Sequence, residues 1–209
     1  MDFNCLLKVL NGETIFTTGL ILAGQSNPGT VRRQLGRWIQ SGRVSQLRRG
    51  VYVLAPPYAA SAPHPFRVSN LLGKSSYVSL QSALAYYGII PEYVPVTTAV
   101  TPGRPGEFET SSGRFLFRHV RSSSFFGFAE TEVSRGQSAL LASPAKALTD
   151  LLYLTPGSDD EGFLQELRLE PSRLPARAEL NRTAESLGSY KVKRCLQILV
   201  ASGLVRKKR

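Results

Sequence analysis

The first sixty residues divide into short apolar stripes that are separated by turn residues. Four apolar residues at helical spacing precede the turn pair Asn11-Gly12, namely Phe3, Leu6, Leu7 and Leu10. This spacing predicts a short amphipathic helix that ends at the turn. Residues 15–23 then predict a short extended piece, a cap at Thr17 or Thr18, and one or two helical turns.

A longer helix is expected to begin at Asn27-Pro28. Asparagine can accept a hydrogen bond from a first-turn amide, and proline lacks only a donor that the first turn does not use. The apolar stripe that would face a core consists of Val31, Leu35, Trp38 and Ile39. Gly42 is placed to end this helix, and residues 43–54 alternate around a tight turn at 48–50, which predicts a β-hairpin.

This order of two short helices, a longer helix and a hairpin is typical of a winged helix-turn-helix, which we expect over residues 1–57. The longer helix of such a domain enters the major groove of DNA. Arginine and glutamine can read base edges there, and basic residues around the helix and wing can contact phosphates. The base-edge candidates are Arg33, Gln34 and Arg37, and Thr30 lies on the same outward face. The phosphate candidates are Arg32, Arg43, Arg48 and Arg49. The alternative is a solvated basic face with no ligand.

A segment rich in proline, alanine and serine, residues 55–66, indicates a linker to a second domain over 66–209. His64 lies between two prolines in this linker and is expected on the surface. The second domain is predicted to be mixed α/β, which makes the whole chain α+β. Helices are expected over 66–73 and 76–88, the second with Val78, Leu80, Leu84 and Tyr87 mostly on one side. Strands follow, and a helix opens at Ser143-Pro144.

The C-terminal segment, residues 156–209, is predicted to be helical and strongly basic. Between Pro171 and Arg209, ten basic residues stand against two acidic ones. A second basic surface could be formed by Lys191, Lys193 and Arg194. The spacing of Val192, Leu196, Val200, Gly203 and Val205 repeats that of Val31, Leu35, Ile39, Gly42 and Val44. Either a duplicated DNA-binding unit or an ordinary amphipathic helix with a glycine end explains this repeat. The basic tail 206–209 is expected to be disordered.

Charge and composition narrow the class of partner. The formal net charge of +11 predicts attraction to polyanions. Two cysteines far apart in the chain, Cys5 and Cys195, suggest buried free thiols rather than a disulfide or a zinc site. With no long apolar run and no leader-like start, we expect a soluble cytoplasmic protein that does not insert into a membrane.

The sequence contains few patterns that indicate a catalytic site. Glu130 and Glu132 alternate along one predicted strand face and could join Asp150 as the metal-binding acids of a nuclease, but a solvated strand face is the simpler interpretation. No phosphate-binding glycine loop occurs. We therefore predict no catalytic residue, no metal and no cofactor. Lys146 and Asp150 at i, i+4 are expected to form an ion pair on a helix surface. Phe125-Phe126 are expected in the core, although a partner-binding edge is an alternative.

Several stretches together resemble the AbiEi antitoxins of type IV toxin–antitoxin systems. These are "LRRGVYVL", "VSLQSALAYYGIIP", "VPVTTAVT", "FFGF" and "ASPAKALTDLLYL", which spread over nearly the whole chain. The resemblance implies a winged helix that represses its own operon and an α/β domain linked to neutralising a nucleotidyltransferase-like toxin. It places operator contact on the helix face from Arg33 to Arg37 and on Arg48-Arg49. The chain departs from the family at Ala145, where a glutamate is usual.

The expected function is therefore a cytoplasmic DNA-binding autorepressor and antitoxin. Because one winged helix contacts few base pairs, we expect a homodimer or a cooperative pair on an inverted repeat of double-stranded DNA. The alternative is a stand-alone winged-helix regulator whose α/β domain senses a ligand or dimerises, with no toxin partner. A metal-dependent nuclease ranks third.

Overall fold

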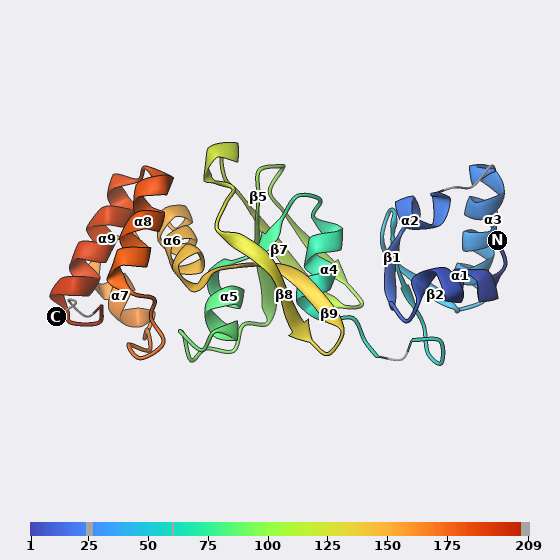
Figure 1. The fold of residues 1–209 in the computed structure, drawn as a ribbon, viewed down its shortest axis with the longest axis horizontal. Coiled ribbons are helices and arrows are strands. Elements are labelled where there is room, and N and C mark those ends of the chain that lie inside the picture. The colour runs from blue at the N-terminus through green and yellow to red at the C-terminus, as the bar shows by residue number, and fades with distance from the viewer. Residues whose placement is uncertain (24–26, 60, 206–209) are drawn as a thin grey trace.

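The computed structural model describes residues 1–23, 27–59 and 61–205. The chain is α+β, with a small sheet near the N-terminus, a larger sheet in the middle and a group of helices at the far end (Figure 1). Within the described residues, no helix is long and apolar enough to cross a membrane. The basic tail and part of the turn before Asn27 lie outside the described residues.

The N-terminal unit packs three helices against one face of a three-stranded antiparallel sheet. Its elements are α1 (Phe3–Leu10), β1 (Ile15–Thr17), α2 (Thr18–Leu22), α3 (Pro28–Gln40), β2 (Val44–Arg48) and β3 (Val51–Leu54). The strands lie in the order β1-β3-β2. The core between helices and sheet contains Phe3, Leu6, Leu10, Phe16, Ile21, Val31, Leu35, Trp38, Val44, Tyr52 and Leu54. The predicted apolar stripes are thus confirmed as the core faces.

Local signals place the ends of these elements where the sequence predicts them. The Thr17 hydroxyl accepts a hydrogen bond from Leu20 N–H, and the Asn27 side chain accepts one from Thr30 N–H. Gly50 adopts a positive φ of 87° in the hairpin turn, a conformation that side chains with a Cβ rarely take.

The second unit is built on a six-stranded mixed sheet in the order β6-β7-β5-β4-β9-β8. Its elements are α4 (Pro65–Leu72), β4 (Tyr77–Val78), α5 (Leu80–Tyr86), β5 (Val96–Thr101), β6 (Gly106–Thr110), β7 (Gly113–His119), the short η1 (Ser122–Ser124), β8 (Phe128–Ser134), β9 (Gln137–Ala142) and α6 (Pro144–Leu154). The pairs β5–β7 and β4–β9 are parallel and the others antiparallel. The predicted α/β character is confirmed.

The C-terminal helices are part of the same core as this sheet. They are α7 (Glu161–Glu166), α8 (Arg177–Leu187) and α9 (Tyr190–Ala201), and α6 contacts both α8 and α9 (Figure 1). One hydrophobic cluster runs from Tyr77 and Val78 in β4 through α6 to Val192 and Leu199 in α9. Helix α6 is therefore enclosed by protein along most of its length.

The two units share an apolar interface. The small sheet presents Ile15, Leu47 and Val51 on the face away from its own helices. These side chains pack with Val68, Leu72, Ala99, Phe115 and Phe117 of the second unit. Just beyond α4, Gly73 is required by close packing, because a Cβ there would lie 2.2 Å from the Phe117 ring. An ion pair between Arg67 and Glu13, 3.0 Å apart, also joins the two units.

Three local expectations are wrong. Val78 lies in strand β4 rather than in a helix, and α5 begins only at Leu80, because the short strand continues the sheet between β5 and β9. Cys5 is exposed, since the core positions of α1 are Phe3, Leu6 and Leu10, whereas Cys195 is buried as expected. His64 is half-buried and caps α4, because its Nδ1 accepts a hydrogen bond from Phe66 N–H.

Candidate nucleic-acid interface

The outer face of α3 carries most of the predicted DNA-binding residues. Its exposed side chains are Thr30, Arg32, Arg33, Arg37 and Gln40. Residues three and four positions apart are neighbours on a helix, so Arg33 lies beside both Thr30 and Arg37. Gln34 is half-buried at the border between this face and the core. One side of α3 thus presents a basic surface, while Val31, Leu35 and Trp38 fix the other side in the core.

The arginines of this face have no acidic partner in the described part of the chain, which contains every aspartate and glutamate. The ion pairs found there involve other cations, namely Arg67, Arg114, Lys146, Arg168 and Arg194. Within the described ranges, the Arg33 side chain makes one long hydrogen bond, 3.4 Å, to the Thr30 hydroxyl. Like charges at i, i+4 cost a helix a few tenths of a kcal/mol. The basic face is therefore suited to an external anion.

Arg43 lies beyond the end of α3 and contacts α1. Its guanidinium is 5.2 Å from the centroid of the Phe3 ring. Its backbone carbonyl accepts a hydrogen bond from Ala55 N–H at 2.9 Å, so the residue is held at the base of the hairpin. Arg43 is thus exposed beside α1, beyond the C-terminal end of α3.

The hairpin separates the two arginines that were expected to act together. Arg48 Nη1 donates a 2.7 Å hydrogen bond to the Leu72 carbonyl, and its guanidinium lies 4.4 Å from the centroid of the Phe108 ring. Both contacts are with the second unit. Arg49 is exposed and its guanidinium has no hydrogen bond to any described residue. Arg48 therefore braces the hairpin, and Arg49 is the freer cation.

A cleft of about 510 Å³ lies between the hairpin turn and the second unit. Arg48 and Arg49 line it together with Lys74 and Arg104 of the second unit. Lys74 and Arg104 were not predicted as site residues, because each stands alone in a loop of the sequence. Only the packing of the small sheet on α4 and β7 brings them near the hairpin.

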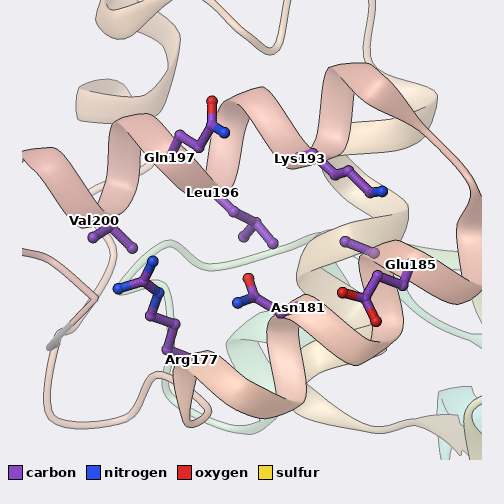
Figure 2. A pocket seen from close by; sticks show the side chains of 8 residues that line it. Arg177, Asn181, Glu185, Lys193, Leu196, Gln197 and Val200 are labelled. Atoms are coloured by element: carbon purple, nitrogen blue, oxygen red, sulfur yellow. The ribbon is translucent and has the colours of Figure 1, made fainter. Parts of the chain in front are cut away.

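Lys191, Lys193 and Arg194, which were expected to form a second basic surface, have different surroundings among the described residues. Lys191 Nζ donates hydrogen bonds to the carbonyls of Tyr153 at 2.9 Å and Thr155 at 2.7 Å, so it closes the end of α6. Arg194 lies 3.5 Å from Asp159. Lys193 is exposed and lines a groove of about 210 Å³ between α8 and α9. Glu185 of α8 lines the same groove (Figure 2).

The groove between α8 and α9 has mixed charge. Figure 2 shows polar side chains from both helices around it, and they are Arg177, Asn181, Glu185, Lys193 and Gln197. A basic and an acidic residue stand on α8 and a basic residue on α9, so the groove lacks the uniform sign of the α3 face. It does not resemble a phosphate-binding surface.

The expectation that Lys146 and Asp150 form a surface ion pair is wrong, since both side chains are 0% exposed. The two groups are hydrogen-bonded to each other, and Asp150 also accepts 2.9 Å hydrogen bonds from the hydroxyls of Tyr77 and Ser79. The spacing i, i+4 is right, but α6 is enclosed between α5 and the C-terminal helices.

Burial shifts the pKa values of this cluster. Desolvation lowers the pKa of Lys146 and raises that of Asp150, and Lys146 partly offsets the shift of the carboxyl. Desolvation and the neighbouring Asp150 also raise the pKa of Tyr77, which therefore stays protonated and donates its hydrogen bond. The Lys146 and Asp150 side chains are enclosed by protein, so this cluster is part of the core.

The remaining candidate residues for catalysis lie apart from this cluster. Glu130 and Glu132 are exposed on β8, as expected for a solvated strand face. No group of three histidine, cysteine or acidic residues within the described ranges could hold a metal ion. Phe125 and Phe126 are half-buried, with the Phe125 ring 5.2 Å from that of Tyr77 and the Lys146 ammonium 4.7 Å from that of Phe126. Phe125 packs against the core, as predicted, and Phe126 lies over the buried Lys146 ammonium.

Comparison with protein-family models gives no match, and comparison with curated proteins gives none either. Among solved structures, the chain is similar to the RV2827C protein from Mycobacterium tuberculosis. The TM-score is 0.48 and the identity 15%, over 98% of this chain and 81% of that one.

Proposed function

We propose that this chain is a sequence-specific DNA-binding repressor whose N-terminal unit acts as a winged helix. The observation that carries the proposal is the outer face of α3, where Arg32, Arg33 and Arg37 are exposed without acidic partners in the described part of the chain. Helix α3 is preceded by the short α2 and followed by an antiparallel hairpin, the order in which a recognition helix precedes a wing.

The roles follow from position and chemistry. Arg33 and Arg37 can fork to guanine in the major groove, and Gln34 can pair with adenine if its half-buried side chain turns outward. Arg32, Arg43 and Arg49 suit phosphates, and Thr30 lies in the first turn of α3, where backbone amides attract anions. Arg48 contributes by holding the hairpin to the second unit.

One recognition helix reads few base pairs, so high specificity requires two copies. We propose that the protein binds an inverted repeat as a dimer or as a cooperative pair, with the two α3 helices in successive major grooves. This arrangement would double the number of base contacts without any change in the chain.

We further propose that the second unit acts as an antitoxin of the AbiEi kind against a nucleotidyltransferase-like toxin. The support is the resemblance noted in the sequence. Its motifs fall on successive structural elements, with "LRRGVYVL" in the hairpin, "VPVTTAVT" in β5 and "ASPAKALTDLLYL" in α6. A second candidate, a stand-alone regulator that senses a ligand, is favoured by the basic cleft between the units.

A footprint on the DNA upstream of the gene, followed by gel shifts at several salt concentrations, tests the DNA proposal. We expect Arg33→Ala to weaken operator binding by roughly ten- to hundredfold while leaving non-specific binding nearly unchanged. Arg49→Ala should weaken both and reduce the salt slope by about one. Arg135→Ala, an exposed arginine in the β8–β9 turn, is the matched control. Unchanged affinity in both α3 and hairpin variants would refute the proposal.

The antitoxin proposal needs a separate readout. We expect the Arg33→Ala/Arg37→Ala variant to lose operator binding in gel shifts. When it is co-expressed with a neighbouring nucleotidyltransferase-like protein, it should still protect cells from growth arrest. The absence of any protection by the wild-type chain would favour the stand-alone regulator.

A further inference from the structure

The cleft between the hairpin turn and the second unit has walls of one charge sign. Four basic residues from three separate segments line it, namely Arg48, Arg49, Lys74 and Arg104. No acidic residue is among those that line it. Arg49, Lys74 and Arg104 are exposed and have no acidic partner within the described residues. Like charges around a concave surface raise its potential, which an anion would offset.

The backbone that carries these cations is held in place. The Thr101 hydroxyl donates to the Ser75 carbonyl at 3.0 Å and accepts from Gly103 N–H at 3.0 Å, which shapes the loop before Arg104. Lys74 follows Gly73, which the Phe117 ring approaches too closely for any side chain. These contacts fix the segments that carry the basic residues before a ligand arrives, which lowers the cost of binding.

The hairpin side of the cleft is fixed as well. Thr18 N–H donates a 2.9 Å hydrogen bond to the Gly50 carbonyl, which ties the turn to the start of α2. Arg48 is held by the Leu72 carbonyl and the Phe108 ring, so its charge faces the cleft from a defined position. Val51, Leu71 and Phe117 contribute apolar parts of the walls, and Thr17, Thr18 and Thr101 also line the cleft.

We propose that this cleft binds the phosphate group of a small ligand of nucleotide size. A volume of about 510 Å³ falls within the range of ligand sites, and arginine and lysine are the usual partners of phosphate. DNA could supply the same phosphate chemistry. The concave shape and the apolar walls favour a free ligand over the outer surface of a duplex. The proposal rests on the second candidate function, the ligand-sensing regulator, and names the class of ligand that its cleft would take. The site uses neither α3 nor a base contact, although it shares Arg49 with the proposed wing.

The test uses calorimetry and thermal melting on the full chain at low salt without DNA. ADP and inorganic pyrophosphate should bind and raise the melting temperature, because a ligand that binds only the folded state stabilises it. Adenosine, which lacks the phosphates, should do neither. Lys74→Ala and Arg104→Ala should each weaken ADP binding by about tenfold, the loss typical of one charged hydrogen-bonding partner.

Two controls separate this site from general charge attraction and from DNA binding. Arg135→Ala removes an exposed arginine outside the cleft and should leave ADP affinity unchanged. Arg33→Ala should also leave it unchanged, although it weakens operator binding, so each proposal can fail alone. No binding of ADP or pyrophosphate, equal weakening by Arg135→Ala, or an effect of Lys74→Ala on DNA affinity only would overturn the proposal.

Discussion

The ammonium group of Lys146 and the carboxylate of Asp150 meet inside the second unit, where neither side chain is exposed. Removing a charge from water costs several kcal/mol, and the pair is tolerated because each charge has a partner. Asp150 has two more, the hydroxyls of Tyr77 and Ser79, which satisfy its second oxygen. The contribution of each group to the stability of the fold therefore depends on the presence of the others.

Removal of the cation alone should be costly. We expect Lys146→Met to lower the free energy of unfolding by about 3–5 kcal/mol, because it leaves the Asp150 carboxylate buried without a cation. In the double variant Lys146→Met/Asp150→Asn, the amide oxygen can still accept from Tyr77 and Ser79, so at least half of the loss should be recovered. Urea denaturation measures both. Lys8→Met on exposed α1 surface is the control, and a double variant no more stable than the single one would contradict the prediction.

His64 predicts a pH dependence. Its Nδ1 must be unprotonated to accept the 3.2 Å hydrogen bond from Phe66 N–H, and burial lowers its pKa from 6.5. The stabilisation is therefore fully present above pH 6.5 and is lost as the pH falls through the lowered folded-state pKa. His64→Asn keeps a capping oxygen that does not titrate. The wild type should lose more thermal stability than this variant between about pH 7 and pH 5; equal losses would argue against the cap.

At the scale of elements, most of the described helices have an N-cap side chain from the residue just before them. The C-terminal end of α6 is instead capped by a residue far along the chain. Asn27 and Ser143 cap α3 and α6 by accepting hydrogen bonds from amides three residues ahead. The last carbonyls of α6 instead accept from Lys191, which is 36 residues after Thr155. A cation at this end also interacts favourably with the helix dipole. Helix α6 thus depends on α9 for its termination.

A matched pair of substitutions on α9 measures this contribution. We expect Lys191→Met to lower the free energy of unfolding by about 1–3 kcal/mol, since two carbonyls lose a charged donor. Lys193→Met, two residues along the same helix, removes an exposed lysine and should change stability by no more than about 0.5 kcal/mol. Chemical denaturation compares the two, and an equal effect of both variants would show that Lys191 acts only through its charge.

At the scale of the whole molecule, the small sheet has two buried faces. The helices of the N-terminal unit pack on one face. The other face packs on the second unit through Ile15, Leu47 and Val51. The hairpin is therefore held against the second unit by apolar packing and by Arg48. The hairpin forms both the proposed wing and one wall of the cleft. A change in the packing at this interface should therefore alter the position of both.

Weakening the interface should uncouple the units. Leu47 is 9% exposed, and Leu47→Ala should lower the free energy of unfolding by about 2–4 kcal/mol. Because the units share an apolar interface, we expect the wild type to unfold in one calorimetric transition. In Leu47→Ala this transition should broaden or split, because the units then unfold less cooperatively. Val9→Ala, at an exposed position of α1, is the control. A Leu47→Ala melting curve that matches the wild type in midpoint and width would contradict this coupling.

Sequence patterns alone predicted the core face and start of α3, the hairpin, the start of α6 and the exposed arginines of α3. These features depend on helical or alternating periodicity and on capping residues, which act within a few positions of each other. The short strands β4 and β6 were not predicted, because each is defined by pairing with a distant strand. The half-buried state of Gln34 was missed for a similar reason, since the core edge depends on what packs against it.

Only the tertiary structure decided where the remaining charges act. The same i, i+4 spacing of Lys146 and Asp150 fits a surface or a core, and enclosure of α6 by other helices placed the pair in the core. Arg48 was predicted to be as free as Arg49, yet the packing of the small sheet on α4 gives it the Leu72 carbonyl. Sequence determines which groups are present and their local geometry, whereas burial and partners depend on segments that meet only after folding.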